Sequence, residues 1–218
     1  MFKGDGDEKL DAEKRERGIR SIDSKRFKSQ IEFIMEVDKL KKIMRRTMLM
    51  DRSRQENSAE HSWHIALIVL VLSEYVEADN LNLLRVIKLL LTHDLVEIDA
   101  GDTYCYDESG IRDQKERETR AADRIFNILP EDQAKSFRGL WDEYEDRKTS
   151  ESRFANALDR FQPLLHNYFT QGQSWRQHGI QKKQVLSRMQ PVEEGAPALW
   201  AYVTSLIDDA VEKGFLAK

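Results

Sequence analysis

The sequence predicts an all-α fold, a helical bundle built around one hydrophobic core. Apolar residues recur at spacings of three and four over several long segments, which is the period of an amphipathic helix. No alternating, turn-bounded strand pattern stands out, and neither does a repeat with a period of roughly 20 to 50 residues. The chain has 218 residues, enough to enclose a sizeable core. We therefore expect one domain of packed helices.

The two ends of the chain differ from its middle. Residues 1–24 consist mainly of charged residues and glycine, so we expect a mobile or frayed N-terminal arm. Residues 25–218 are expected to fold as a single helical domain. The motifs described below fall within residues 30–170 of that domain, and residues 171–218 are expected to form a C-terminal helical extension.

Three helices are expected in the first half of the chain. "QIEFIMEVDKLKKIMRR", from Gln30 to Arg46, has the helical period and predicts the first core helix. Asn57 and Glu60 have the spacing of a capping box, which predicts a helix through "HSWHIALIVLVLSEYVEA". "NLLRVIKLLLTHDLVEI" is apolar almost all round, as a buried central helix is, and Gly101 is placed to end it.

Four more helices are expected in the second half. "QKERETRAADRIFNIL" ends before Pro130, and "PEDQAKSFRGLWDEYEDR" begins with that proline in its first turn. In "SESRFANALDRFQPLLHNYFTQG" we expect Pro163 to kink the helix rather than end it. The last amphipathic helix runs from Pro197 to Phe215. Residues 171–190 are polar and basic, and three interpretations stay open: a cover for an active-site mouth, a self-association surface or a surface connection.

Composition excludes several classes of partner. Charged residues make up 34% of the chain, but the net charge is only −4 and the signs are interspersed, so we expect no nucleic-acid partner. The longest apolar run, "IALIVLVL", is far shorter than the roughly 20 residues that cross a bilayer. Cys105 is the single cysteine, and the amino terminus lacks the apolar run of a secretory signal, so a cytoplasmic location is expected.

The stretch "LLLTHDLVEIDAGD" places ionisable groups at the end of an apolar helix. A helix would bring His93, Asp94 and Glu97 to one side, because they are three and four residues apart. Burying such groups is costly unless they are paired, and a divalent cation satisfies imidazole and carboxylate together. His61 and Asp159 also interrupt apolar helix faces and have the chemistry of metal ligands.

The order of these residues resembles a known superfamily. His61 in "SAEHS", His93 and Asp94 in "THD", and Asp159 in "ALDRF" resemble the pattern of the HD-domain metal-dependent phosphohydrolases. "RRTMLMDRSRQENSAEHS", "HDLVEIDAGD" and "ANALDRFQPLL" are similar to the branch that contains bacterial 5'-deoxynucleotidases and related HD hydrolases. The resemblance covers roughly residues 30–170 and implies an HD-domain helical bundle.

The resemblance also implies roles for individual residues. Arg46 would hold the substrate phosphate, with Arg54 as a second candidate. Thr47 stands where we expect characterised deoxynucleotidases to have a sugar-contacting tryptophan, so the sugar preference stays open. One metal ion would be bound by four ligands: His61, His93, Asp94 and Asp159. Two further carboxylates, Glu97 and Asp102, would assist the chemistry.

The predicted activity is hydrolysis of a phosphate monoester, most plausibly a nucleoside 5'-monophosphate, by attack of a metal-activated water. Two imidazoles and two carboxylates without a thiolate suit Mn, Co, Fe, Ni or Zn, with Mg as a further candidate. A homodimer is implied by the family resemblance.

Two other functions stay open, and so do simpler interpretations of single residues. The protein could be an HD phosphodiesterase or pyrophosphohydrolase for a cyclic or hyperphosphorylated nucleotide, or a non-catalytic metal-stabilised nucleotide-binding module. Arg46, taken alone, suits a solvated helix face, and Asp99 suits a solvated helix end. We interpret His64 and His166 as supporting or core histidines rather than ligands.

Overall fold

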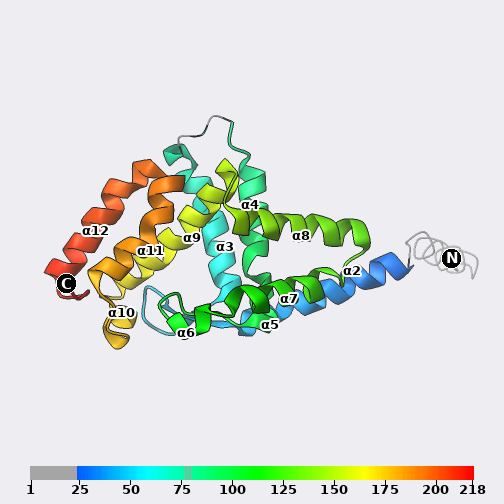
Figure 1. Ribbon diagram of the computed structural model, residues 1–218, viewed down its shortest axis with the longest axis horizontal. Coiled ribbons are helices and arrows are strands. Elements are labelled where there is room, and N and C mark those ends of the chain that lie inside the picture. The colour runs from blue at the N-terminus through cyan, green and yellow to red at the C-terminus, as the bar shows by residue number, and fades with distance from the viewer. Residues whose placement is uncertain (1–23, 77, 79) are drawn as a thin grey trace, which may run out of the picture.

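The computed structural model describes residues 24–76, 78 and 80–218, and helices dominate them (Figure 1). The predicted all-α class is confirmed, and a single two-stranded sheet is the only sheet in the described residues. The predicted arm lies outside the described residues, apart from Ser24, where the first described helix begins. No helix of the described part is both long and apolar enough to cross a membrane.

The first core helix is shorter than the sequence predicts. Helix α2 (Ser24–Val37) is followed by a 3₁₀ turn, η1 (Asp38–Lys42), and then by strand β1 (Met44–Met48). Strand β1 pairs antiparallel with β2 (Gln55–Asn57). The prediction that the helix continues to Arg46 is therefore wrong. Apolar spacings of three fit a 3₁₀ turn as well as an α-helix, and a strand of five residues is too short to reveal its alternation.

Three helices form the centre of the molecule: α3 (Ser58–Leu72), α4 (Leu83–Thr92) and α9 (Ser150–Phe169) (Figure 1). Helix α3 begins at the predicted capping box: the Asn57 side chain accepts from the Glu60 N–H, and the Glu60 carboxylate accepts from the Asn57 N–H. A short turn, η2 (Ser73–Tyr75), follows α3. Helix α9 continues through Pro163, as predicted.

The end of α4 differs from the predicted α-helix. The chain tightens at His93 into a 3₁₀ turn, η3 (His93–Val96), and then forms the short helix α5 (Glu97–Ala100). Gly101 ends α5, as predicted, with a φ of 75° that favours glycine. Since a 3₁₀ turn advances 120° per residue, it changes the directions in which the charged side chains after Thr92 point.

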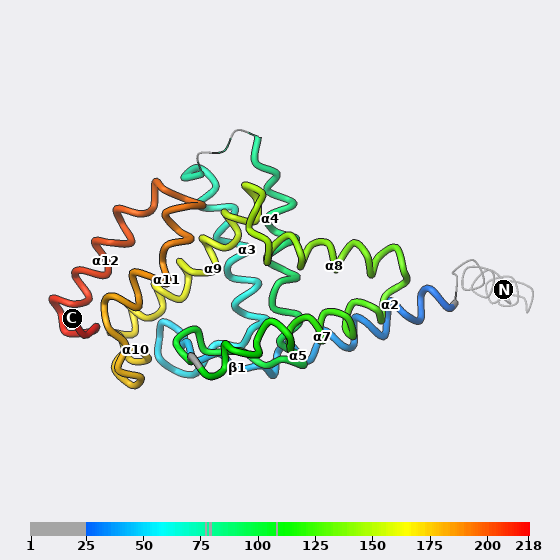
Figure 2. The backbone as a smooth tube through the Cα atoms, viewed as in Figure 1, coloured from blue at the N-terminus to red at the C-terminus, as the bar shows by residue number. Residues whose placement is uncertain are grey.

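The buried apolar residues of the described part form two hydrophobic clusters. One contains buried residues of α3, α4, α9 and the C-terminal helices. The other contains buried residues of α2 and η3 together with α7 (Gln114–Phe126) and α8 (Glu131–Asp146). A short helix, α6 (Glu108–Ile111), precedes α7. Pro130 is the N-cap residue of α8, whereas the sequence predicts it within the first turn of that helix. Helix α2 and the C-terminus lie at opposite ends of the molecule (Figure 2).

Residues 171–218 are mainly helical. They include α10 (Gln173–Gln177), α11 (Lys182–Gly195), the 3₁₀ turn η4 (Pro197–Leu199) and α12 (Trp200–Glu212). Helix α11 packs along α9 and buries Val185, Met189 and Val192. The interpretation of residues 171–190 as a plain surface connection is therefore wrong, because α11 supplies part of the core and part of a cavity wall.

Candidate metal centre

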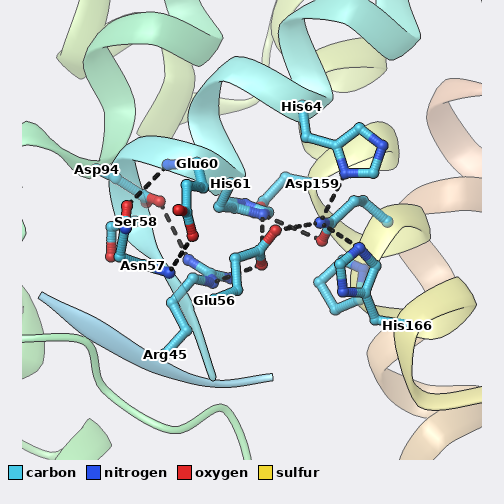
Figure 3. A network of polar contacts seen from close by, with 12 residues as sticks. Arg45, Glu56, Asn57, Ser58, Glu60, His61, His64, Asp94, Asp159 and His166 are labelled. Carbon is cyan, nitrogen blue, oxygen red and sulfur yellow. Dashed lines mark hydrogen bonds and ion pairs between the residues drawn. The ribbon is translucent and has the colours of Figure 1, made fainter. Parts of the chain in front are cut away.

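The structure brings together the four predicted metal ligands. Helix α3 supplies His61, η3 supplies His93 and Asp94, and α9 supplies Asp159. His61 Nε2 lies 2.8 Å from Asp159 Oδ1, and His93 Nε2 lies 2.9 Å from Asp94 Oδ1 and 3.7 Å from Asp159 Oδ1. All four side chains are buried. Figure 3 shows His61, Asp94 and Asp159 in this network.

The hydrogen bonds of His93 leave one ring nitrogen for a cation. His93 Nδ1 lies 2.8 Å from the Leu90 carbonyl oxygen, which can only accept, so Nδ1 carries the proton. The lone pair of Nε2 then faces carboxylate oxygens, and this buried atom has no well-directed hydrogen bond among the described residues. A lone pair facing a carboxylate requires a proton or a metal ion between them. The residues present therefore fit a divalent metal ion.

Charge within the centre is strongly coupled. Burial opposes a charge on His93, but Asp94 and Asp159 outweigh it and raise the pKa of this imidazole well above its usual value. Burial likewise opposes a charge on Asp159, but Arg160 and the two imidazoles hold the pKa of this carboxyl well below its usual range. Arg160 donates a hydrogen bond to Asp159. The carboxylates are therefore ionised, which is the form that binds metal, and a bound metal ion would replace the proton that His93 holds between itself and these carboxylates.

Two more carboxylates stand beside the ligands. Glu97 is buried and accepts a hydrogen bond of 2.6 Å from the Ser58 hydroxyl. Burial and the neighbouring Asp94 raise the pKa of Glu97 well above its usual value. Burial also raises the pKa of Asp102, although Arg45 opposes the shift. Both residues line the same cavity as Asp94, where they can exchange protons with a bound molecule.

Of the two arginines on β1, the one that contacts the centre is Arg45, which the sequence analysis did not single out. Its Nη1 lies 3.1 Å from Asp94 Oδ2, and its Nε lies 3.8 Å from Glu56 Oε2. Arg46 instead places its guanidinium 5.5 Å from the centre of the Tyr104 ring. Adjacent residues of a strand point in opposite directions, so the strand decides which arginine reaches the carboxylates. A helix-based interpretation of this segment could not distinguish them.

A cavity of about 820 Å³ opens over the centre. Arg46 and Thr47 line it, as expected for substrate contacts. Arg54 does not: its guanidinium pairs with both oxygens of Glu60 near the start of α3, at 2.7 and 2.8 Å. Arg54 is close to Arg46 in the sequence, but its side chain is exposed and engaged by Glu60.

Two further arginines of the cavity wall received no role in the sequence analysis. Arg160 follows the ligand Asp159 on α9, and Arg188 comes from α11. Arg188 makes no hydrogen bond or ion pair with any residue that the structure describes. Burial and the neighbouring Arg160 lower its pKa. A partly buried guanidinium without a partner, facing a cavity, is suited to an anionic ligand.

The fold and the ligand pattern define a class of protein. A family model described as HD domain matches residues 37–200, and the chain belongs to this family. The resemblance to HD-domain metal-dependent phosphohydrolases is thereby confirmed.

Particular relatives narrow the comparison. A crystal structure from Magnetospirillum magnetotacticum, described as a predicted metal-dependent phosphohydrolase, is 49% identical, with a TM-score of 0.85 over 88% of this chain and 96% of that one. The human protein named 5'-deoxynucleotidase HDDC2 is 30% identical over 139 residues. The match covers 63% of this chain and 66% of the human protein, just under two thirds of the human protein's length. A conserved hypothetical protein from Pyrococcus furiosus, 19% identical with a TM-score of 0.57, shares the fold.

Proposed function

We propose that this protein is a metal-dependent phosphohydrolase that cleaves a phosphate monoester, with a nucleoside 5'-monophosphate as its substrate. The observation that carries the proposal is the convergence of two imidazoles and two carboxylates at the base of a cavity, with Glu97 and Asp102 beside them. A purely structural metal site would not need two more carboxylates, one of them buried, facing the same cavity. The names of the Magnetospirillum and human relatives support this activity.

Each residue has a distinct task in this reaction. When bound by His61, His93, Asp94 and Asp159, a divalent metal ion supplies Lewis acidity to the phosphoryl oxygen and the attacking water. Glu97, held by Ser58, accepts or delivers a proton next to the ligands. Asp102, which follows Gly101 and lines the same cavity, is the second carboxylate that can accept or deliver a proton. The donor set suits Mn, Co, Fe, Ni or Zn.

The substrate phosphate is held by guanidinium groups of the cavity wall. Arg45 is already engaged with Asp94, so its charge serves mainly to balance the carboxylates. Arg46 and Arg188 have no carboxylate partner among the described residues and are therefore the better anion contacts. Thr47 has a small side chain beside Arg46, which leaves room for a ribose 2'-hydroxyl. We therefore propose relaxed selection between ribose and deoxyribose.

One observation favours a second candidate function. A diester or pyrophosphate substrate requires a wide cavity and basic residues beyond a single phosphate contact, and the cavity wall contains Arg46, Arg160 and Arg188. An HD phosphodiesterase or pyrophosphohydrolase for a cyclic or hyperphosphorylated nucleotide is therefore the alternative.

A substrate panel tests both candidates. The protein, stripped of metal and then given Mn²⁺, Co²⁺, Zn²⁺ or Mg²⁺ separately, is assayed for product formation from ribo- and deoxyribonucleoside 5'-monophosphates, a cyclic dinucleotide and a nucleoside with a 3'-pyrophosphate. The proposal predicts release of inorganic phosphate from the monoesters. Turnover of the diester or pyrophosphate alone would establish the alternative, and binding of nucleotides without turnover of any would favour a non-catalytic module.

We also propose that the protein is a homodimer and works in a reducing, cytoplasmic environment. Helix α3 exposes an uncharged apolar stripe, formed by Trp63, Leu67, Leu70 and Val71. A twofold pair of such stripes would remove this surface from water. Light scattering is expected to give twice the chain mass for the wild type and the chain mass for Leu70→Glu. A wild-type protein at the mass of one chain would contradict the dimer.

A further inference from the structure

A second group of metal-binding side chains lies beside the centre. Glu56 of β2, His64 of α3 and His166 of α9, here called the second cluster, each place one ligand atom within 4.8 Å of the other two. Glu56 and His166 are buried, and His64 is partly exposed. Figure 3 shows the three side chains directed toward a common point on the side of His61 away from Asp94. None of them is among the ligands of the proposed catalytic metal.

The common point is filled by the amide nitrogen of one glutamine. Gln162 Nε2 lies 2.6 Å from Glu56 Oε1, 2.9 Å from His166 Nε2 and 3.3 Å from His64 Nδ1. The orientation of the amide follows from His61: its Nδ1 lies 3.1 Å from Gln162 Oε1 and carries the proton when Nε2 faces a metal ion. Gln162 therefore directs its NH₂ group at the second cluster.

The second cluster contains more acceptors than the amide has protons. His166 Nδ1 lies 2.9 Å from the Met48 carbonyl oxygen and donates to it, so His166 Nε2 presents a lone pair. The NH₂ group of Gln162 has two protons for three acceptors. In addition, Glu56 Oε2 is buried and accepts no hydrogen bond in the described residues, because His61 Nδ1 at 3.6 Å and Arg45 Nε at 3.8 Å are too far away to donate one. The amide alone therefore leaves lone pairs in this cluster unsatisfied, which is costly at buried sites.

We propose that Glu56, His64 and His166 form a second binding site for a divalent transition-metal ion. Two imidazole nitrogens and one carboxylate oxygen are a ligand set that Zn²⁺ and Co²⁺ favour. The hydrogen bond from His166 to a backbone carbonyl is the arrangement that orients metal-binding histidines. His64 is partly exposed, so an ion can reach this site from solvent.

Binding at the second cluster requires the Gln162 amide to leave the common point. Its movement breaks the contact with His61 Nδ1, which orients a ligand of the first ion. The second ion therefore binds more weakly than the first, because it displaces an existing hydrogen-bonded group. The second site is therefore filled only after the first site is saturated with metal.

The test counts metal ions on the full-length protein. Chelator-stripped protein is titrated with Co²⁺ by calorimetry, and bound cobalt is measured by elemental analysis after equilibrium dialysis. The wild type is expected to bind two equivalents, the second more weakly, and His64→Gln is expected to bind one. His178→Gln is the matched control: this partly buried histidine packs 4.8 Å from the Tyr104 ring, outside the cluster, and the variant should bind two equivalents.

Substitution in the first site separates this proposal from the proposed function. Asp94→Asn is expected to lose the tighter equivalent and keep the weaker one, and the double variant with His64→Gln is expected to bind none. A wild type that binds a single equivalent, unaffected by His64→Gln and abolished by Asp94→Asn, would overturn the second site and leave the proposed function intact. A single equivalent abolished only by His64→Gln would contradict the catalytic centre instead.

Discussion

Arg45→Met tests how the buried carboxylates of the metal centre are compensated. The Arg45 side chain is only 13% exposed, and its Nη1 lies 3.1 Å from Asp94 Oδ2. The carboxylates around it, with Asp94 the strongest influence, raise its pKa despite burial. Breaking a buried ion pair from one side costs about 3–5 kcal/mol, because a charge is left without a partner. We expect this loss in the free energy of unfolding of the metal-free protein.

The loss corresponds to a measurable change in melting temperature. For a chain of this size each kcal/mol shifts the melting temperature by roughly 2–4 °C, so Arg45→Met is expected to melt roughly 10 °C below the wild type. Circular dichroism in a chelating buffer measures the difference. With excess Co²⁺ the difference should shrink, because a bound dication compensates Asp94 in place of the arginine.

Arg46→Met is the matched control for this prediction. It removes a neighbouring guanidinium whose contact is the Tyr104 ring rather than a buried carboxylate. Such a contact contributes about 0.5–1 kcal/mol at an exposed site, so this variant should melt close to the wild type. Equal melting temperatures for the two variants would refute the argument that Arg45 compensates the buried carboxylates.

Three further predictions concern turnover, substrate selection and stability. Glu97→Gln should bind the same amount of metal as the wild type, but kcat should fall by roughly 10²-fold or more because the proton carrier is lost; full turnover would remove Glu97 from the mechanism. Thr47→Trp should raise the ratio of kcat/KM for deoxyribonucleotides over ribonucleotides, and an unchanged ratio would show that residue 47 does not contact the sugar. Gly172→Ala should lower the urea midpoint by an amount equivalent to at least about 1–3 kcal/mol, since φ is 68° and the added Cβ would lie 1.9 Å from the Phe215 carbonyl oxygen; an unchanged midpoint would contradict this account of the turn.

The sequence was most informative where a local pattern has one physical meaning. The Asn57 capping box fixed the start of α3, and Gly101 fixed the end of α5, because few other residues suit those backbone positions. The four proposed ligands were found because their order resembles a family pattern. Their convergence could not be derived from spacing alone, since α3, η3 and α9 are far apart in the chain.

The sequence was least informative where tertiary contacts decide the structure. The hairpin of β1 and β2 is too short to show a period, so the sequence did not reveal that Arg45 points toward the buried carboxylates. Arg188 belongs to a helix whose packing on α9 brings it to the cavity, which no local motif could reveal. The sequence does not show that His64 and His166 lie close to Glu56, because the three residues come from α3, α9 and β2.

The central claim is that His61, His93, Asp94 and Asp159 hold the metal ion on which hydrolysis depends. The most direct test measures phosphate release from a nucleoside 5'-monophosphate by one sample as isolated, after chelation and after Co²⁺ is returned, with Asp94→Ala assayed in parallel. The account predicts that activity disappears on chelation, returns with Co²⁺ in the wild type, and stays absent in Asp94→Ala together with the tightly bound metal. Phosphate release that persists in the chelated wild type, or in Asp94→Ala, would contradict it.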